Sequence, residues 1–138
     1  MRRVDKAALL VTILFMALVN WDAVAQQSGS VKQISFEKGA ICTRVHGQLA
    51  AGQDAVSYSL QARDGQHMIV NLAPWGTGAE FANSGTVTSP SGKQDGGKGG
   101  IIYDARLTES GEYKIRVGRN LMATQGGKAS FVLEIVIY

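Results

Sequence analysis

Apolar and polar residues alternate along short segments of the chain from about residue 32 to the C-terminus. Alternation with a period of two is typical of a β-strand with one buried and one exposed face. The clearest case is the stretch 107–117, where a turn at 109–111 precedes a strand with two distinct faces. Its apolar face carries Tyr113, Ile115 and Val117, and its polar face carries Lys114 and Arg116.

Seven further segments have strand character: residues 32–36, 41–49, 55–62, 67–72, 80–88, 101–107 and 128–138. Gly47 within the second segment indicates a bulge or a bend. The Asp-Gly pair in residues 63–66 predicts a hairpin turn, and residues 89–92 predict another turn. The glycine-rich stretch 92–100 predicts a flexible loop tip, and residues 119–127 predict a further loop before the last strand. The pattern therefore predicts an all-β protein, a single antiparallel β-sandwich of jelly-roll-like type with about eight strands and no substantial helix.

The N-terminus has the composition of a secretory signal. A basic start is followed by an apolar run over residues 7–19, which is short for a bilayer span, and then by Ala23-Val24-Ala25. We therefore expect cleavage after Ala25, a signal peptide over residues 1–25 and one domain over residues 26–138. The expected location is the periplasm or the exterior, with no membrane association after cleavage.

Charge and cysteine content narrow the classes of partner and compartment. Residues 26–138 hold 11 Lys and Arg against 9 Asp and Glu, and this weak basic balance argues against nucleic-acid binding. Cys42 is the only cysteine, so an intrachain disulfide is excluded. A buried, small apolar role is predicted for Cys42; a reactive thiol and an intermolecular bridge are the alternatives.

Motifs for catalysis or metal binding are missing from the sequence. The two histidines, His46 and His67, fall in separate segments, and neither a CxxC nor an HExxH motif occurs. The glycine-rich stretch is not followed by a helix, so it does not have the form of a phosphate-binding loop. We therefore predict a protein that is not an enzyme and that needs no metal or cofactor.

Three motifs resemble the bacterial pre-peptidase C-terminal domain. They are residues 58–72, residues 89–92, and residues 107–117 with their Ser-Gly-x-Tyr core. Among the forms of that domain that stand alone behind a signal peptide, the chain is similar to the periplasmic inhibitors of g-type (goose-type) lysozyme. The resemblance implies a small β-sandwich that inserts a polar loop into the active-site cleft of a host lysozyme.

The resemblance also implies which residues would bind. The loop after the Ser-Gly-x-Tyr strand is the inhibitory one, and Arg119 and Asn120 match the Arg-Asn pair of that family. An arginine on a rigid loop suits a cleft with essential carboxylates. Ser110, Gly111 and Tyr113 are expected to support the loop: Gly111 permits the turn, and Tyr113 packs inward with its hydroxyl bonded to backbone.

Two other functions remain open. The first is a carbohydrate- or peptidoglycan-binding accessory module, in which exposed Trp75 and Tyr103 would stack on sugar rings; a structural role for Trp75 is a plug over one end of the sandwich. The second is a structural envelope protein with an unidentified partner.

Overall fold

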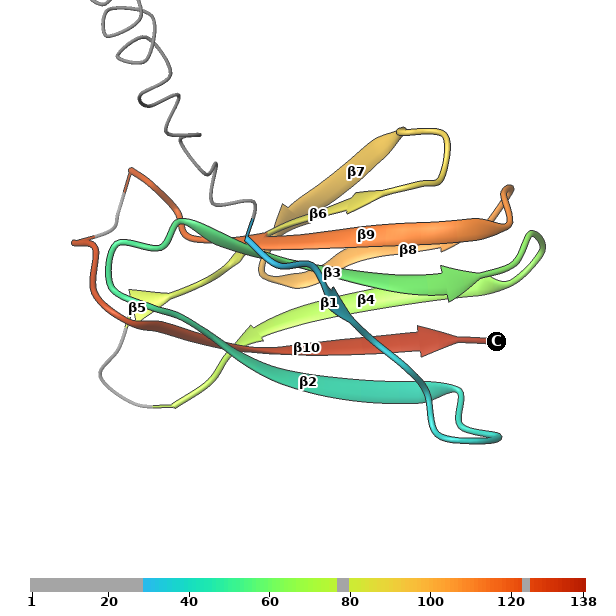
Figure 1. The fold of residues 1–138 in the computed structure, drawn as a ribbon, viewed down its shortest axis with the longest axis horizontal. Helices are drawn as coiled ribbons and strands as arrows, with labels where there is room; N and C mark the ends of the chain where they lie inside the picture. Colours follow the sequence, from blue (N-terminus) through green and yellow to red (C-terminus); the bar gives the residue numbers. More distant parts are fainter. Residues whose placement is uncertain (1–28, 77–79, 123–124) are drawn as a thin grey trace, which may run out of the picture.

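The computed structural model describes residues 29–76, 80–122 and 125–138, and the signal peptide expected over residues 1–25 lies outside them. The described residues form ten strands and no helix (Figure 1). Among them, no helix has the length and hydropathy needed to cross a membrane. Eight of these strands have five or more residues. The other two strands, β1 (Lys32–Gln33) and β5 (Glu80–Phe81), have two residues each.

The strands form two layers that lie face to face (Figure 1). Sheet A has the order β1, β3 (Ala55–Ala62), β9 (Gly111–Gly118), β6 (Ser84–Thr88) and β7 (Gln94–Lys98). Sheet B has the order β2 (Cys42–Leu49), β10 (Ala129–Ile137), β4 (His67–Pro74) and β8 (Gly100–Arg106), with β5 paired to β10. Every pairing is antiparallel except those of β1 with β3 and of β5 with β10. The predicted antiparallel β-sandwich is therefore confirmed.

The core lies between the two sheets and consists of the inward faces that the alternation predicts. In β10, at the centre of sheet B, Phe131, Leu133 and Ile135 are fully buried. In β9, Tyr113, Ile115 and Val117 are buried, while the intervening Lys114 and Arg116 are exposed. Burial of one apolar face per strand is the main favourable term that holds such a sandwich together.

Gly47 does not mark a bulge, contrary to the expectation from sequence. It lies in regular register opposite Phe131 in the β2–β10 ladder. A Cβ atom at Gly47 would come within 2.1 Å of the Phe131 ring and 2.7 Å of the Tyr58 hydroxyl. The glycine is therefore needed because these rings occupy the space of a side chain. The irregularity occurs instead between β4 and β8, at Val70 and Asn71.

Two predictions about connections are wrong. The stretch 92–100 contains β7, which pairs with β6 along its full length, so it is not a flexible loop. Its glycines and polar residues gave no alternation, because an edge strand is held mainly by its backbone hydrogen bonds. Residues 63–66 do not form a hairpin turn, since β3 belongs to sheet A and β4 to sheet B. This turn passes from one layer to the other, and Gly65 adopts a φ of 87° there.

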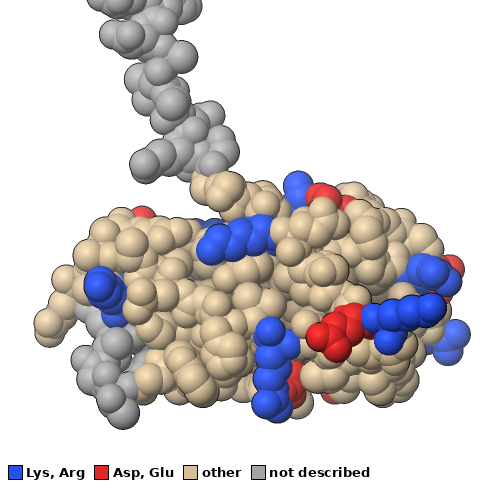
Figure 2. Space-filling model, turned by 60° about the horizontal axis from the view of Figure 1, so that its bottom comes forward, with Lys and Arg blue, Asp and Glu red and all other residues tan. Residues whose placement is uncertain are grey.

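The buried role predicted for Cys42 is also wrong. On β2, the side chains of Thr43 and Val45 face the core between the sheets. Cys42 therefore lies on the outer face of β2 and is exposed. The outer neighbour Arg44 forms an ion pair with Glu134 on β10. On the side shown in Figure 2, Lys and Arg side chains are spread over uncharged surface and do not gather into a stripe.

The connections gather at two opposite ends of the sandwich (Figure 1). One end, which we call the loop end, carries residues 50–54, 75–76 and 119–122. The other, which we call the turn end, carries residues 63–66, 89–93 and 107–111. The sequence-predicted site residues are divided between these two ends.

Candidate functional site

Arg119 lies at the loop end with its side chain turned into the protein. Only 5% of its surface is exposed. Its guanidinium donates hydrogen bonds from Nε to the Gln53 carbonyl oxygen and from Nη2 to the Ala50 carbonyl oxygen, each at 2.7 Å. The family resemblance implies an arginine that reaches outward to a partner. In the structure the guanidinium instead fastens the segment 50–53 to the end of β9.

Backbone hydrogen bonds tie residues 52–54 to the end of β9 and to the segment before β10. The Arg119 N–H donates to the Asp54 carbonyl oxygen at 3.1 Å, and the Gly52 N–H donates to the Gly126 carbonyl oxygen at 3.0 Å. The Gln53 side chain closes the first segment on itself, because its Oε1 accepts from the Ala50 N–H at 3.0 Å and its Nε2 donates to the Ala55 carbonyl oxygen at 3.1 Å. Hydrogen bonds therefore connect residues 50–55 to Arg119 and Gly126 at the loop end.

Asn120 and the two residues after it form the outward side of this end. The Asn120 Oδ1 accepts a hydrogen bond from the Met122 N–H at 3.1 Å, which is an Asx-turn that fixes the local backbone. This turn presents two large apolar side chains to solvent, with Leu121 65% and Met122 98% exposed. Leu121 and Met122 are adjacent and exposed, so together they form a candidate contact surface at this end. The sequence motifs pointed to Arg119 and Asn120 and gave no sign of these two neighbours.

Trp75 belongs to the same end. It follows β4 directly, its N–H donates to the Ser130 carbonyl oxygen at 3.4 Å, and 54% of its surface is exposed. Its indole ring meets the His46 ring edge-on, with 4.5 Å between the ring centroids. The tryptophan therefore rests against the outer face of sheet B and does not plug the space between the sheets.

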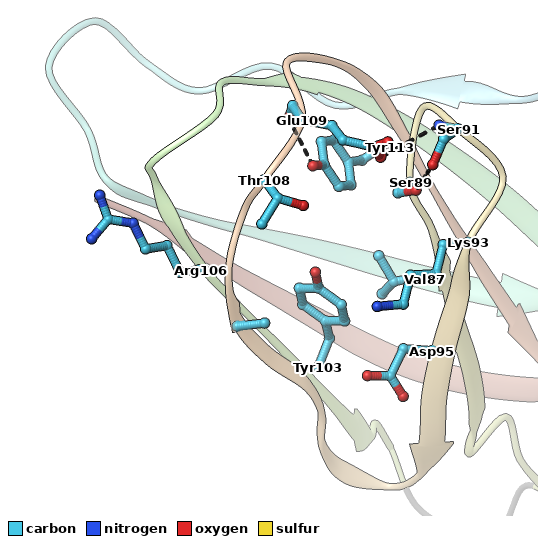
Figure 3. Close-up of a pocket in the computed structure, with 11 residues that line it drawn as sticks. Val87, Ser89, Ser91, Lys93, Asp95, Tyr103, Arg106, Thr108, Glu109 and Tyr113 are labelled. Carbon is cyan, nitrogen blue, oxygen red and sulfur yellow. Dashed lines mark hydrogen bonds between the residues drawn. The ribbon is translucent and has the colours of Figure 1, made fainter.

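Ser110, Gly111 and Tyr113 lie at the turn end, remote from Arg119. The Tyr113 hydroxyl donates to the Glu109 carbonyl oxygen at 2.8 Å, as the sequence predicts (Figure 3). Burial raises the pKa of the Tyr113 hydroxyl above its usual range. The Ser110 hydroxyl accepts from the Asp64 N–H at 2.9 Å, and Gly111 has a φ of 143°. These residues shape a turn at the far end of β9, eight residues of strand away from the loop that they were expected to support.

A network of acceptors and donors ties the same turn to the β6–β7 hairpin. The Ser91 N–H donates to the Glu109 carboxylate at 3.4 Å (Figure 3). Hydrogen bonds from the Ser91 and Ser89 side chains lower the pKa of this carboxyl, with a smaller contribution from the charge of Lys93. The Glu109 carboxylate therefore links the turn before β9 to the turn between β6 and β7 through hydrogen bonds.

Tyr103 lies beside this network and not near Trp75. It is half-buried on β8, opposite Val70, and lines a cavity of about 200 Å³ (Figure 3). Trp75 comes five residues after Val70 on β4, which is about 16 Å along an extended strand. The two aromatic residues considered for sugar stacking therefore cannot contact one ring together.

The described residues contain no group of three or more His, Cys, Asp or Glu placed to hold a metal ion. The two histidines lie apart: His46 packs on Trp75, and His67 contacts Asp104 at 2.5 Å and stacks on Tyr138. Among the described residues, we find no nucleophilic side chain hydrogen-bonded to a histidine that could act as its base.

The two sheets, with loops at both ends held by hydrogen bonds, form a β-sandwich. No protein-family model matches the chain, and no curated protein matches its sequence. Among solved structures, the fold is similar to that of Aeromonas hydrophila PliG, a periplasmic inhibitor of g-type lysozyme. That likeness has a TM-score of 0.63 at 24% identity and covers 79% of this chain and 96% of that one.

Two further structures share the architecture. Salmonella Typhimurium PliG, also a periplasmic inhibitor of g-type lysozyme, matches with a TM-score of 0.62 at 19% identity, covering 80% of this chain and all of that one. The pre-peptidase C-terminal domain of a Bacillus anthracis collagenase matches with a TM-score of 0.51 at 13% identity, covering 79% of this chain and 95% of that domain. Both resemblances expected from sequence motifs are thus confirmed at the level of the fold.

Proposed function

We propose that this protein is an exported lysozyme inhibitor that binds its target through the loop end. The proposal is supported by the likeness to two periplasmic inhibitors of g-type lysozyme over nearly their full lengths. The observation that carries it is the fixed turn at Asn120, which projects Leu121 and Met122 from a loop fastened on its inner side by Arg119. The protein is proposed to act in the periplasm and to have no catalytic activity of its own.

The loop end has the physical properties that tight inhibition requires. Binding costs the entropy of ordering a loop unless the loop is already in place. Here the segment 50–54 and the end of β9 are joined by the Arg119 side chain and by backbone hydrogen bonds before any partner arrives. A rigid projection can therefore enter a concave cleft with little rearrangement.

Arg119 and Asn120 would act in different ways in such a complex. Arg119 would stabilise the conformation of the binding loop without contacting the partner, because its guanidinium donates hydrogen bonds to backbone carbonyl oxygens. Asn120 would set the turn that presents the apolar tip, and its amide would lie at the edge of the contact. The energy of binding would come mainly from burying Leu121 and Met122, as at the anchors of other interfaces.

The experiment is a panel of three lysozyme classes. Purified protein is mixed with goose-type, chicken-type or invertebrate-type lysozyme, and the lysis of a cell-wall suspension is followed by turbidity. We expect protection against the goose-type enzyme at micromolar or lower protein. Unimpaired lysis by all three enzymes would refute inhibition. Protection against a class other than the goose type would keep the inhibitor function and refute the specificity.

A further inference from the structure

The turn end holds a second candidate site, formed by the cavity of about 200 Å³ beside Tyr103 (Figure 3). The cavity lies between the β6–β7 hairpin and β8, which belong to different sheets. Its polar lining comes from Ser91, Lys93, Asp95, Tyr103, Thr108 and Glu109. It is smaller than the usual pocket for a drug-sized ligand, so a single small ring is the size that suits it.

Polar side-chain groups point into this cavity from two opposite walls (Figure 3). The Tyr103 hydroxyl and the Thr108 hydroxyl are directed into the space, and the Lys93 ammonium approaches from the opposite wall (Figure 3). Burial, followed by the nearby charge of Asp95, raises the pKa of the Tyr103 hydroxyl, so this group remains a neutral donor. Val87 and Ala105 provide apolar wall between these groups.

The charges around the cavity balance. Lys93 and Arg106 are basic, Asp95 and Glu109 are acidic, and the Arg106 side chain points away from the space (Figure 3). The Glu109 carboxylate is already engaged by Ser91 and Ser89. An anion would meet the Asp95 carboxylate and a cation would meet the Lys93 ammonium, so a neutral ligand with several hydroxyl groups is favoured.

We propose that this cavity binds one pyranose ring of a neutral or N-acetylated saccharide. The apolar side of the ring would lie against Tyr103 and Val87, which is the usual role of aromatic side chains toward amphipathic ligands. Its hydroxyl groups would exchange hydrogen bonds with Thr108, Lys93 and Asp95. Because the cavity and the loop end are at opposite ends of the sandwich, saccharide and lysozyme could be bound at the same time.

Nuclear magnetic resonance titration of the whole protein tests this site. The probes are glucose and N-acetylglucosamine, with inorganic phosphate and ammonium as charged comparisons. We expect saturable shifts for at least one sugar, confined to residues that line the cavity, with a dissociation constant of about 1–10 mM. Failure of both sugars to shift these residues at several times that concentration would overturn the proposal. Saturable binding of phosphate or ammonium there, tighter than that of either sugar, would also overturn it.

Conservative variants show whether a sugar binds in the cavity or elsewhere on the surface. Tyr103→Phe and Thr108→Val keep the shape of the side chains and should each weaken sugar binding by about 3- to 10-fold. Trp75→Ala removes the other candidate aromatic and should leave the shifts and the affinity unchanged. Unchanged affinity in both cavity variants, or loss of binding in Trp75→Ala, would contradict the assignment. Lysozyme inhibition by Tyr103→Phe and Thr108→Val should equal that by the wild type, so the two proposals can fail independently.

Discussion

The guanidinium Nη2 of Arg119 and the carbonyl oxygen of Ala50 lie 2.7 Å apart, although 69 positions separate the two residues in the chain. The contact joins the end of β9 to the β2–β3 connection. A charged donor bonded to backbone carbonyl oxygens in a buried setting is a strong interaction. The binding loop that we propose therefore depends on a residue that a partner would hardly touch.

Replacement of Arg119 tests this role. Arg119→Ala leaves the Gln53 and Ala50 carbonyl oxygens without the guanidinium, and we expect the free energy of unfolding to fall by about 2–3 kcal/mol. Arg119→Lys keeps the charge but lacks the planar fork, so it should recover only part of that loss. Urea denaturation of the three proteins measures both effects. Equal stability of all three would show that the arginine does not hold these loops.

The apolar tip should matter for binding and not for folding. Met122→Asp places a charge on a side chain that is 98% exposed, so the free energy of unfolding should change by less than about 0.5 kcal/mol. Inhibition of goose-type lysozyme should weaken by about 10-fold or more, since a charge would be buried in the contact. Ile101→Asp is the matched control, because Ile101 is 63% exposed on β8. An equal effect of both substitutions would place the contact elsewhere.

Gly47 offers a test of the core. Gly47→Ala introduces a methyl group 2.1 Å from the Phe131 ring, which is fully buried. We expect a loss of about 1–3 kcal/mol in the free energy of unfolding, the usual cost of overpacking. Gly97→Ala is the control, because a Cβ atom there meets its nearest neighbour at 3.6 Å. A larger loss in the control than in Gly47→Ala would contradict the packing described here.

The Glu109 carboxylate should make stability depend on pH in a defined direction. Hydrogen bonds from Ser91 and Ser89 lower its pKa in the folded state below the ordinary value of 4.5. A lowered pKa stabilises the fold above the ordinary value, and this contribution is lost as the pH falls through the folded value. Wild type should therefore exceed Glu109→Gln in stability at neutral pH, and the difference should shrink below pH 4.5. Urea midpoints from pH 7 to pH 3 test this, and a gap that widens in acid would be the wrong sign.

Alternation in the sequence predicted most of the sandwich. The inward faces of β3, β4, β9 and β10 are those that the pattern indicated, because each strand buries one continuous apolar set. β7 could not be found in this way. Its sequence, Gln-Asp-Gly-Gly-Lys, has no apolar face, and it pairs with β6 through its backbone. For β2 the alternation correctly placed Cys42 and Arg44 on one face and Thr43 and Val45 on the other. It did not show which of these faces is buried, so Cys42 was wrongly predicted to be buried.

The candidate site was harder to predict than the fold. Motif order pointed to the segment that begins at Arg119, but an arginine in a loop gives no local sign that its charge will be buried. Its partners lie in residues 50–53, which are brought close only by the packing of β3 on β9. Leu121 and Met122 escaped notice because two apolar residues in a loop have no periodicity. The cavity beside Tyr103 is lined by residues from both sheets. No single sequence segment contains its lining, so the sequence pattern could not predict it.

Hydrogen–deuterium exchange of the protein, with and without goose-type lysozyme, shows whether lysozyme binds at the loop end. The method reports whether the two proteins bind and which backbone segments the contact covers. We expect slower exchange in the complex at residues 50–54 and 119–122, with residues 89–93 and 107–111 at the turn end unchanged. Protection at the turn end in place of the loop end, or the same exchange with and without lysozyme, would contradict this expectation.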